Sequence, residues 1–176
     1  MIFHETDLKG ALLIEIERHE DTRGFFARSW CQQECEAHGL NPNVVQCNVS
    51  FNTHKGTLRG LHYQSFPHQE AKLVRCTAGA IYDVIVDLRP TSSGFKKHAA
   101  FTLTAGNHAM LYVPEGFAHG FLTLEDNTEI FYQMSDFYSP HSSKGVRWND
   151  PAFGIYWPFP PSVISDRDQS YPDYLF

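Results

Sequence analysis

The chain has 176 residues, of which 42% are hydrophobic and 19% are charged. This composition is typical of a globular protein with a sizeable core and excludes a disordered chain, so we expect one domain over residues 1–176. The 14 Lys and Arg residues and the 20 Asp and Glu residues give a net charge of -6, which argues against a partner such as nucleic acid or an anionic membrane. A local cationic pocket for a small anionic ligand is compatible with that balance.

The first residues, Met1–Asp7, contain no basic segment followed by an apolar run, and no apolar stretch approaches the ~20 residues that a membrane helix needs. The cysteines Cys31, Cys35, Cys47 and Cys76 include no C-x-x-C pair, so a zinc site built from them is not expected. Free thiols without a visible export signal predict a cytoplasmic location.

The first quarter of the chain predicts little regular structure. Leu12–Ile16 alternates weakly and is typical of a strand, His19–Gly24 is predicted to be a polar turn, and Phe25–Trp30 resumes an extended pattern. Gln32–His38 is the one expected helix, because Gly39 follows it where a left-handed cap is favoured.

From Val44 onward, short runs rich in Val, Ile, Phe, Tyr and Thr are separated by Gly, Asn or Pro. Eight such runs are predicted strands: Val44–Phe51, Leu58–Gln64, Ala71–Thr77, Ala80–Leu88, His98–Thr104, His108–Val113, Phe117–Leu124 and Glu129–Phe137. Many short strands with few helices predict an all-β sandwich or barrel. The proline-rich tail after Trp148 is expected to be irregular, with at most one short edge strand.

Several predicted strands place a group able to exchange protons or donate hydrogen bonds on one of their faces. These groups are Gln46 and Asn48, His62, Lys72, and Tyr132. If those faces line one barrel mouth, they form a pocket. Arg59 lies three positions before His62, so a regular strand would point the two to opposite faces. A bulge at Gly60 would bring both side chains to one site.

Two segments resemble cupin motifs. Gly56 is followed at the appropriate distance by His62, and a proline and glycine turn leads from Pro114 into His119. Metal-binding cupins carry a second histidine two residues after the first, but this chain has Gln64 there. His62, His119 and Glu70 would make a poor ligand set, so we expect no metal.

Eight segments, two of which overlap the cupin motifs, occur in a fixed order along the chain: Asp21–Phe26, Gln46–Asn48, Leu58–Gln64, Ala71–Arg75, Tyr82–Arg89, Val113–Phe121, Trp148–Pro151 and Ser165–Asp168. In this order they are similar to the dTDP-4-dehydrorhamnose 3,5-epimerase family, a metal-independent branch of the cupins. The resemblance covers nearly the whole chain. It implies an all-β cupin-type jelly roll with one or two short helices, and a carbohydrate epimerase that needs no cofactor.

The resemblance implies four catalytic residues. An epimerase of this kind removes a proton beside the ketone of a nucleotide-diphosphate sugar and returns one on the opposite face, for which a histidine has a suitable pKa. By resemblance His62 is that base and Asp168 fixes its tautomer. Lys72 stabilises the charge on the ketone oxygen, and Tyr132 donates the returning proton. Without the surrounding motifs, a hydrogen-bonded core histidine would explain His62 equally well.

The resemblance also implies a set of substrate-binding residues and a partner subunit. Arginine forks bind the diphosphate, other polar groups hydrogen-bond the substrate, and aromatic rings stack on the base or enclose the ligand. The diphosphate-binding arginines are Arg23 and Arg59, the hydrogen-bonding residues are Gln46, Asn48 and His119, and the aromatic residues are Tyr138 and Phe26. Arg167 stands where the family usually has a lysine and keeps its charge. Family members exchange N-terminal strands between two subunits. A homodimer is therefore expected, with Arg23 and Phe26 serving the partner's site.

Two departures from the family pattern leave the substrate open. Arg28 and Ser143 stand where the family usually has glutamate, so the base or the sugar can differ from thymidine and 4-keto-6-deoxyglucose. Three alternatives stay open at this point: a 3- or 5-mono-epimerase, a metal-dependent cupin such as a dioxygenase or isomerase, and a sugar-nucleotide-binding module without catalysis.

Overall fold

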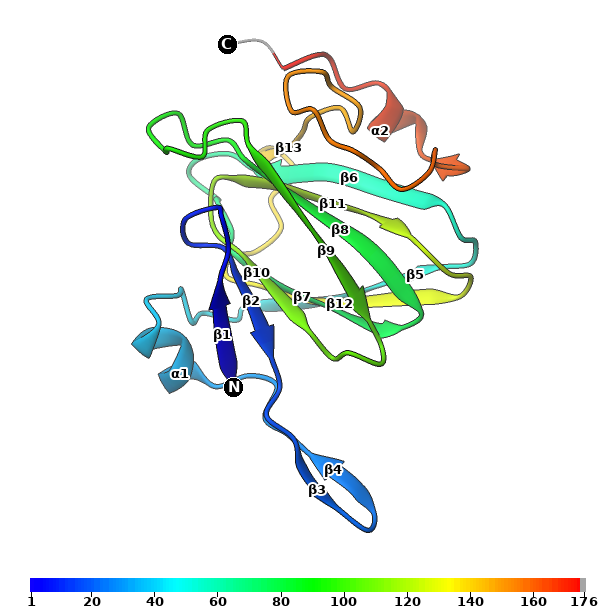
Figure 1. Cartoon of the computed structure of the whole chain (residues 1–176). Helices are drawn as coiled ribbons and strands as arrows, with labels where there is room; N and C mark the ends of the chain where they lie inside the picture. The colour runs from blue at the N-terminus through cyan, green and yellow to red at the C-terminus, as the bar shows by residue number, and fades with distance from the viewer. Residues whose placement is uncertain (175–176) are drawn as a thin grey trace.

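Two sheets packed face to face form the body of the protein in the computed structural model, which describes residues 1–174 (Figure 1). The first sheet runs in the order β1 (Ile2–Glu5), β2 (Leu12–Glu15), β10 (Met110–Val113), β7 (Lys72–Ala78), β12 (Thr128–Met134) and β5 (Gln46–Asn52). The second runs β13 (Ser143–Gly145), β6 (Thr57–Gln64), β11 (Phe117–Thr123), β8 (Ala80–Asp87) and β9 (His98–Thr104), with β14 (Val163–Ile164) paired to β6. The pairs within these sheets are antiparallel, except that β14 runs parallel to β6.

The core lies between the two sheets. Val74 and Ile130 of the first sheet and Ile85 of the second belong to one apolar cluster, and each is 0% exposed. Their removal from water is the main force that holds the sheets together. The predicted all-β, cupin-type jelly roll is confirmed, and the strand runs predicted after Val44 correspond to β5 to β12.

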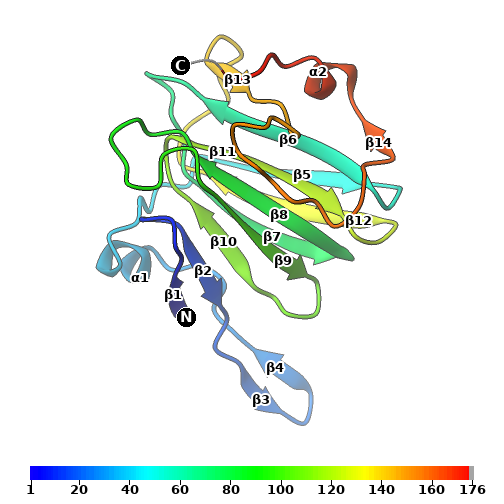
Figure 2. The same ribbon diagram turned by 45° about the horizontal axis from the view of Figure 1, so that its top comes forward.

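The N-terminal region differs from the prediction. His19–Gly24, predicted as a polar turn, contains β3 (His19–Asp21) and the first residue of β4 (Gly24–Phe26), and the two strands form a hairpin. Every residue of both strands is exposed, so no apolar alternation marks them as strands in the sequence. Figures 1 and 2 show this hairpin projecting away from the two sheets.

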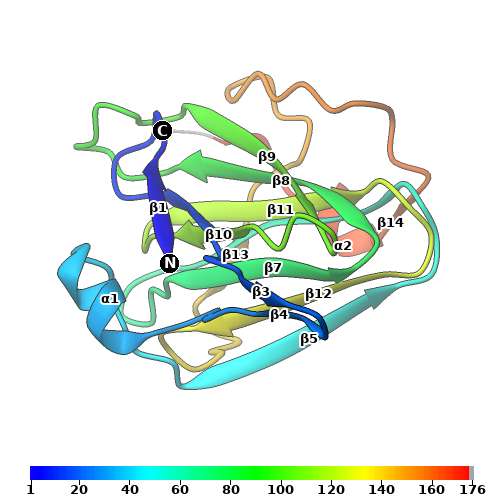
Figure 3. The same ribbon diagram turned by 60° about the horizontal axis from the view of Figure 1, so that its bottom comes forward.

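The predicted helix is present as α1 (Gln32–Ala37), and Gly39 after it has the expected positive φ of 70°. Cys35 and Leu40 pack with Tyr112 of β10 and so fix α1 against the first sheet. Figure 3 shows α1 at one end of that sheet, across which β7, β12 and β5 follow one another. No helix among residues 1–174 is both long enough and apolar enough to cross a membrane.

The tail docks on β6 through a narrow contact at Gly56. The backbone amides of Ser162 and Val163 donate to the Gly56 carbonyl over 2.9 and 3.2 Å. A Cβ on Gly56 would lie 2.4 Å from Ser162 Oγ, so only glycine fits there. The one short edge strand expected in the tail is β14, but a second helix, α2 (Asp166–Gln169), follows it. Four residues are too few to show a helical period in the sequence.

Candidate active site

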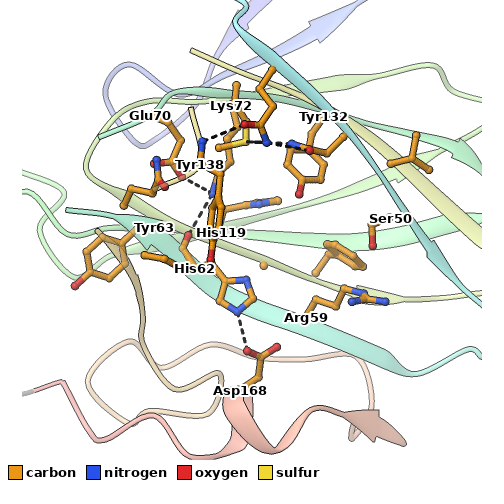
Figure 4. A pocket seen from close by; sticks show the side chains of 18 of the residues that line it. Ser50, Arg59, His62, Tyr63, Glu70, Lys72, His119, Tyr132, Tyr138 and Asp168 are labelled. Carbon is orange, nitrogen blue, oxygen red and sulfur yellow. Dashed lines mark hydrogen bonds and ion pairs between the residues drawn. The ribbon is translucent and has the colours of Figure 1, made fainter. Parts of the chain in front are cut away.

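A pocket of about 640 Å³ opens between the two sheets, and side chains from β5, β6, β7, β11, β12 and α2 line it (Figure 4). The structure thus brings together the polar faces that the sequence placed on separate strands. All the predicted site residues except Arg23 and Phe26 line this pocket: Gln46, Asn48, Arg59, His62, Lys72, His119, Tyr132, Tyr138, Arg167 and Asp168.

A bulge in β6 explains how Arg59 and His62 reach the same pocket. His62 lies opposite His119 of β11, whereas Arg59 lies opposite Phe121, so β6 contains one residue more than β11 over this stretch. Gly60 has a φ of 124°, and a Cβ there would lie 2.6 Å from the Cα of Gly120. The bulge lies at Gly60, as the sequence predicted, because only glycine tolerates this conformation and this close contact.

His62 and Asp168 form a close pair although they are far apart in the chain. Nε2 of His62 lies 2.7 Å from Oδ1 of Asp168, and the Gly60 amide donates to Oδ2 over 3.1 Å. Burial would raise the pKa of Asp168, but hydrogen bonds from His62 and Gly60 outweigh it and hold that pKa below its ordinary value. The ionised carboxylate accepts a hydrogen bond from Nε2–H, so Nδ1 of His62 is left as the basic nitrogen.

The start of α2 positions Asp168. Ser165 caps this helix, and its side-chain oxygen accepts a hydrogen bond from the Asp168 amide over 3.1 Å. A serine followed three residues later by an acidic residue is a common helix-start arrangement, and a carboxylate is stabilised near a helix N-terminus. The tail sequence therefore encodes the local turn that presents Asp168 to His62.

Lys72 reaches the pocket as half of a buried ion pair. Its Nζ lies 3.0 Å from Oε1 of Glu70 and donates to the His62 carbonyl over 3.4 Å. The two side chains are 10% and 3% exposed, and the second oxygen of Glu70 is buried without a hydrogen-bond partner among the described residues. Glu70 thus holds the Lys72 amine at the pocket wall. The sequence suggested Glu70 only as a poor metal ligand, because its proximity to Lys72 does not by itself predict a pair.

Tyr132 stands on β12 with its hydroxyl directed into the cavity (Figure 4). Burial raises the pKa of the hydroxyl, Arg59 lowers it, and Glu70 raises it, with a net upward shift. The phenol is therefore protonated at neutral pH and is able to donate a proton to a ligand.

A second histidine and aspartate pair lies next to the first. Nε2 of His119 is 2.7 Å from Oδ1 of Asp83, and His119 faces His62 across the β6–β11 ladder. His119 and Asp83 are both buried. Asp83 has no role predicted from the sequence. The available signal is a charged residue inside the apolar run Ala80–Leu88, because a buried carboxylate needs a partner.

Three cationic side chains converge on the pocket of this acidic protein: Arg59, Lys72 and Arg167. Nε of Arg59 donates to the Asn52 side chain over 2.7 Å, which fixes the guanidinium at the rim. Arg167 donates to Ser143 over 3.0 Å, so one of the two departures from the family pattern lies in the pocket wall. This cationic lining suits a diphosphate.

The hairpin residues lie elsewhere. Arg23 pairs with Asp21 over 2.5 Å and its side chain is 88% exposed, while Phe26 is 75% exposed. Neither residue lines the pocket of its own chain, because the hairpin points away from the sheets (Figure 2). The other departure, Arg28, pairs with Glu34 near α1, also outside this pocket.

Within residues 1–174, no group of three or more His, Cys, Asp and Glu side chains is arranged to hold a metal ion. Each pocket histidine already faces an aspartate, and Gln64 bonds to backbone groups.

A family model described as dTDP-4-dehydrorhamnose 3,5-epimerase matches residues 5–175. The dTDP-4-dehydrorhamnose 3,5-epimerase of Shigella flexneri is 42% identical over 165 residues, which cover 93% of this chain and 91% of that one. The crystal structure of the Elizabethkingia anophelis NUHP1 protein of the same name has a TM-score of 0.95 at 39% identity, covering 99% and 96% of the two chains. That of Bacillus anthracis str. Ames, with TDP and PPi bound, has a TM-score of 0.94 at 42% identity, covering 98% and 99%.

Proposed function

The chain belongs to the dTDP-4-dehydrorhamnose 3,5-epimerase family, and from this premise we propose that it inverts the carbons beside the ketone of a nucleotide-diphospho-4-keto-6-deoxyhexose. The observation that carries this proposal is the meeting of His62, Asp168, Lys72 and Tyr132 in one pocket. A base with a fixed tautomer, a cation and a protonated phenol are the groups that proton removal and return beside a carbonyl require.

His62 takes the proton from the carbon next to the ketone. Asp168 holds the hydrogen on Nε2, so the proton moves to Nδ1 and the imidazolium that forms faces an ionised carboxylate. The electrons of the broken C–H bond move to the ketone oxygen as an enolate. The positive charge of Lys72, which Glu70 holds in place inside a buried part of the pocket, stabilises this oxygen.

Tyr132 returns a proton to the carbon from the other side of the sugar ring. It stands on the first sheet and His62 stands on the second, so a ring bound between the sheets has one of these groups on each side. Protonation by Tyr132 restores the ketone with inverted configuration. The phenolate then regains its proton, and His62 releases the one it took.

The diphosphate and the base of the nucleotide are assigned to the pocket rim. Arg59 and Arg167 are the arginines that line it, and Tyr138, which is 51% exposed there, is assigned to stack on the base. The Bacillus anthracis relative, whose structure has TDP and PPi bound, supports a thymidine nucleotide.

The working form that we propose is a homodimer with exchanged N-terminal hairpins. Phe26 on the hairpin and Val49 and Phe51 on β5 are exposed at 75%, 61% and 53%, which is unusual for large apolar side chains and typical of an interface. Exchange would place Arg23 and Phe26 at the partner's pocket. The four cysteines are free, which supports a reducing compartment such as the cytoplasm.

The test is incubation with dTDP-4-keto-6-deoxyglucose in heavy water, with exchange at C3 and C5 followed by NMR. Exchange at both carbons is the expected result. Exchange at only one carbon would identify a mono-epimerase, and the absence of exchange with any 4-keto sugar nucleotide would refute the proposed function.

A further inference from the structure

Gln64, the last residue of β6, uses its whole side-chain amide to bind backbone groups. Nε2 donates to the carbonyls of His68 and Phe137 over 2.8 and 3.1 Å, and Oε1 accepts from the Ser139 amide over 2.6 Å. The residue is only 4% exposed. Two carbonyls on one side of the amide and an N–H on the other determine its orientation.

The segment that Gln64 binds has no strand partner of its own. Residues 137–139 follow β12 and are irregular. Gln64 takes the Phe137 carbonyl and the Ser139 amide, and the side chain of Gln46 accepts from the Tyr138 amide over 3.0 Å. Side chains therefore do here what a neighbouring strand does elsewhere in the sheet, and Gln64 holds the backbone on both sides of Tyr138.

Gln64 also joins this segment to the loop after β6. The same Nε2 binds the His68 carbonyl, and the Ser65 amide donates to the Ser142 carbonyl over 2.8 Å. Nδ1 of His68 lies 3.2 Å from Asp136, but this pair is exposed and contributes little by comparison. The buried amide is thus one of several connections between the two loops at this part of the pocket rim, beside the Ser65–Ser142 bond and the bonds between Ala71 and Ser135.

We propose that Gln64 is a positioning residue for nucleobase recognition, which holds the Tyr138 ring where the base of the substrate stacks. The inference rests on the proposed function, in which Tyr138 contacts the base. It also gives a reason for the amide two residues after His62. A neutral imidazole has one donor and one acceptor, so a histidine at this position could not satisfy two carbonyls and one N–H.

Two variants test the proposal. Gln64→Leu removes all three hydrogen bonds, and Gln64→Glu keeps the shape and the acceptor but loses both donors. We expect either variant to raise KM for the sugar nucleotide and the Kd of dTDP about tenfold, because base stacking contributes ~1–3 kcal/mol and tenfold corresponds to ~1.4 kcal/mol. The kcat and the Kd of inorganic pyrophosphate, which has no base, should change less than about twofold.

Asn107→Leu is a control for the loss of three side-chain hydrogen bonds, at an exposed position. Asn107 also makes three hydrogen bonds to backbone groups, to the amides of Thr104 and Ala109 and the carbonyl of Thr102, but it does not line the pocket. It should lower the melting temperature without a change in the Kd of dTDP. If Gln64→Leu does not fold, Gln64→Glu provides the same comparison.

Tyr138→Ala separates the inference from the proposed function. If Tyr138→Ala leaves dTDP binding unchanged, the assignment of Tyr138 to the base is wrong. If Tyr138→Ala weakens dTDP binding and the Gln64 variants do not, the positioning role is wrong and the proposed function stands. When both are correct, Gln64→Glu in the Tyr138→Ala background causes no further loss of dTDP affinity.

Discussion

The pocket has two regions that are built differently. The strand wall, formed by His62, Lys72, His119 and Tyr132, projects from paired strands of both sheets, and three of its members face a buried carboxylate. The rim carries Tyr138 on an irregular segment and Arg167 on a four-residue helix. In the proposed dimer, the exposed hairpin with Arg23 and Phe26 would complete this rim for the other subunit.

Proton transfer and substrate recognition thus depend on different parts of the fold. Residues of the strand wall are fixed by ladder register, so their geometry holds as long as the sandwich is folded. Residues of the rim depend on side-chain hydrogen bonds or, for the hairpin of the proposed dimer, on a second subunit. Changes in the strand wall should therefore lower kcat, and changes in the rim should mainly raise KM.

The largest effect is expected for His62→Ala. Loss of the base should lower kcat by about 100-fold to 10,000-fold and stop proton exchange at both carbons, with dTDP affinity nearly unchanged. NMR in heavy water and calorimetry measure the two quantities. His98→Ala is a suitable control, because His98 bonds to the Phe153 carbonyl and does not line the pocket. An unchanged exchange rate in His62→Ala would remove His62 from the base role.

The next effect concerns the ion pair in the strand wall. Lys72→Gln should lower kcat by about 100-fold to 1,000-fold, because the enolate loses its preorganised cation. It should also destabilise the fold by about 3–5 kcal/mol, since it leaves the Glu70 carboxylate buried and unpaired.

The double variant Glu70→Gln with Lys72→Gln separates these two consequences. Stability measured by denaturant unfolding should largely return, because no uncompensated charge is left, while kcat stays low. Recovery of kcat in the double variant would contradict the role of Lys72 as an enolate stabiliser.

Asp168→Asn tests the link between the two regions, because Asp168 lies in the tail and pairs with His62 of the strand wall. We expect kcat to fall less than in His62→Ala, since the base is kept and only its tautomer is released. The pKa of Asp168 is lowered in the folded protein, so its carboxylate stabilises the fold above the unfolded pKa of about 3.9, and this contribution is lost as pH falls through the folded pKa.

Denaturant unfolding between pH 3 and pH 7 tests whether the Asp168 carboxylate contributes stability that is lost as the pH falls. The loss of stability below about pH 4 should be smaller in Asp168→Asn than in the wild type. A larger acid-induced loss in the variant would show that the carboxylate does not stabilise the folded state in this way.

The smallest effect is expected for Arg23→Ala, which should raise KM about tenfold, since a hydrogen bond from a charged group contributes ~1.5–3 kcal/mol. Mixed dimers give a sharper test at substrate concentrations below KM. If the hairpins are exchanged, a dimer of one His62→Ala subunit and one Arg23→Ala subunit contains one intact site and regains activity. If each hairpin serves its own chain, no intact site exists and nothing is regained.

The strand wall was largely predictable from the sequence, and the rim was not. Alternation along the runs after Val44 placed His62, Lys72 and Tyr132 on strand faces, and a glycine beside Arg59 indicated the bulge. These are local properties with a period of two residues. β3 was mistaken for part of a turn, because a strand exposed on both faces has no such period, whereas Phe25 and Phe26 of β4 were predicted as extended.

The pairing partners were the least predictable feature. Nothing local joins His62 to Asp168 or His119 to Asp83, because these contacts exist only after distant segments have folded together. The family resemblance supplied the first pair, and the second was found only in the structure. Glu70 lies close to Lys72 in the chain, yet it pairs with Lys72 because both side chains are buried, and the hydrophobic pattern of the sequence does not predict that burial.

The parallel pairing of β14 with β6 has a consequence for the order of events during folding. A parallel strand needs a long return connection, so β14 and α2 can join β6 only after the rest of the sandwich provides that edge. The contact between His62 and Asp168, which spans 106 positions, is then expected to be among the last to form. A newly made molecule would complete its two sheets before it could move a proton, and refolding followed by far-ultraviolet circular dichroism and by proton exchange would show the first signal preceding the second.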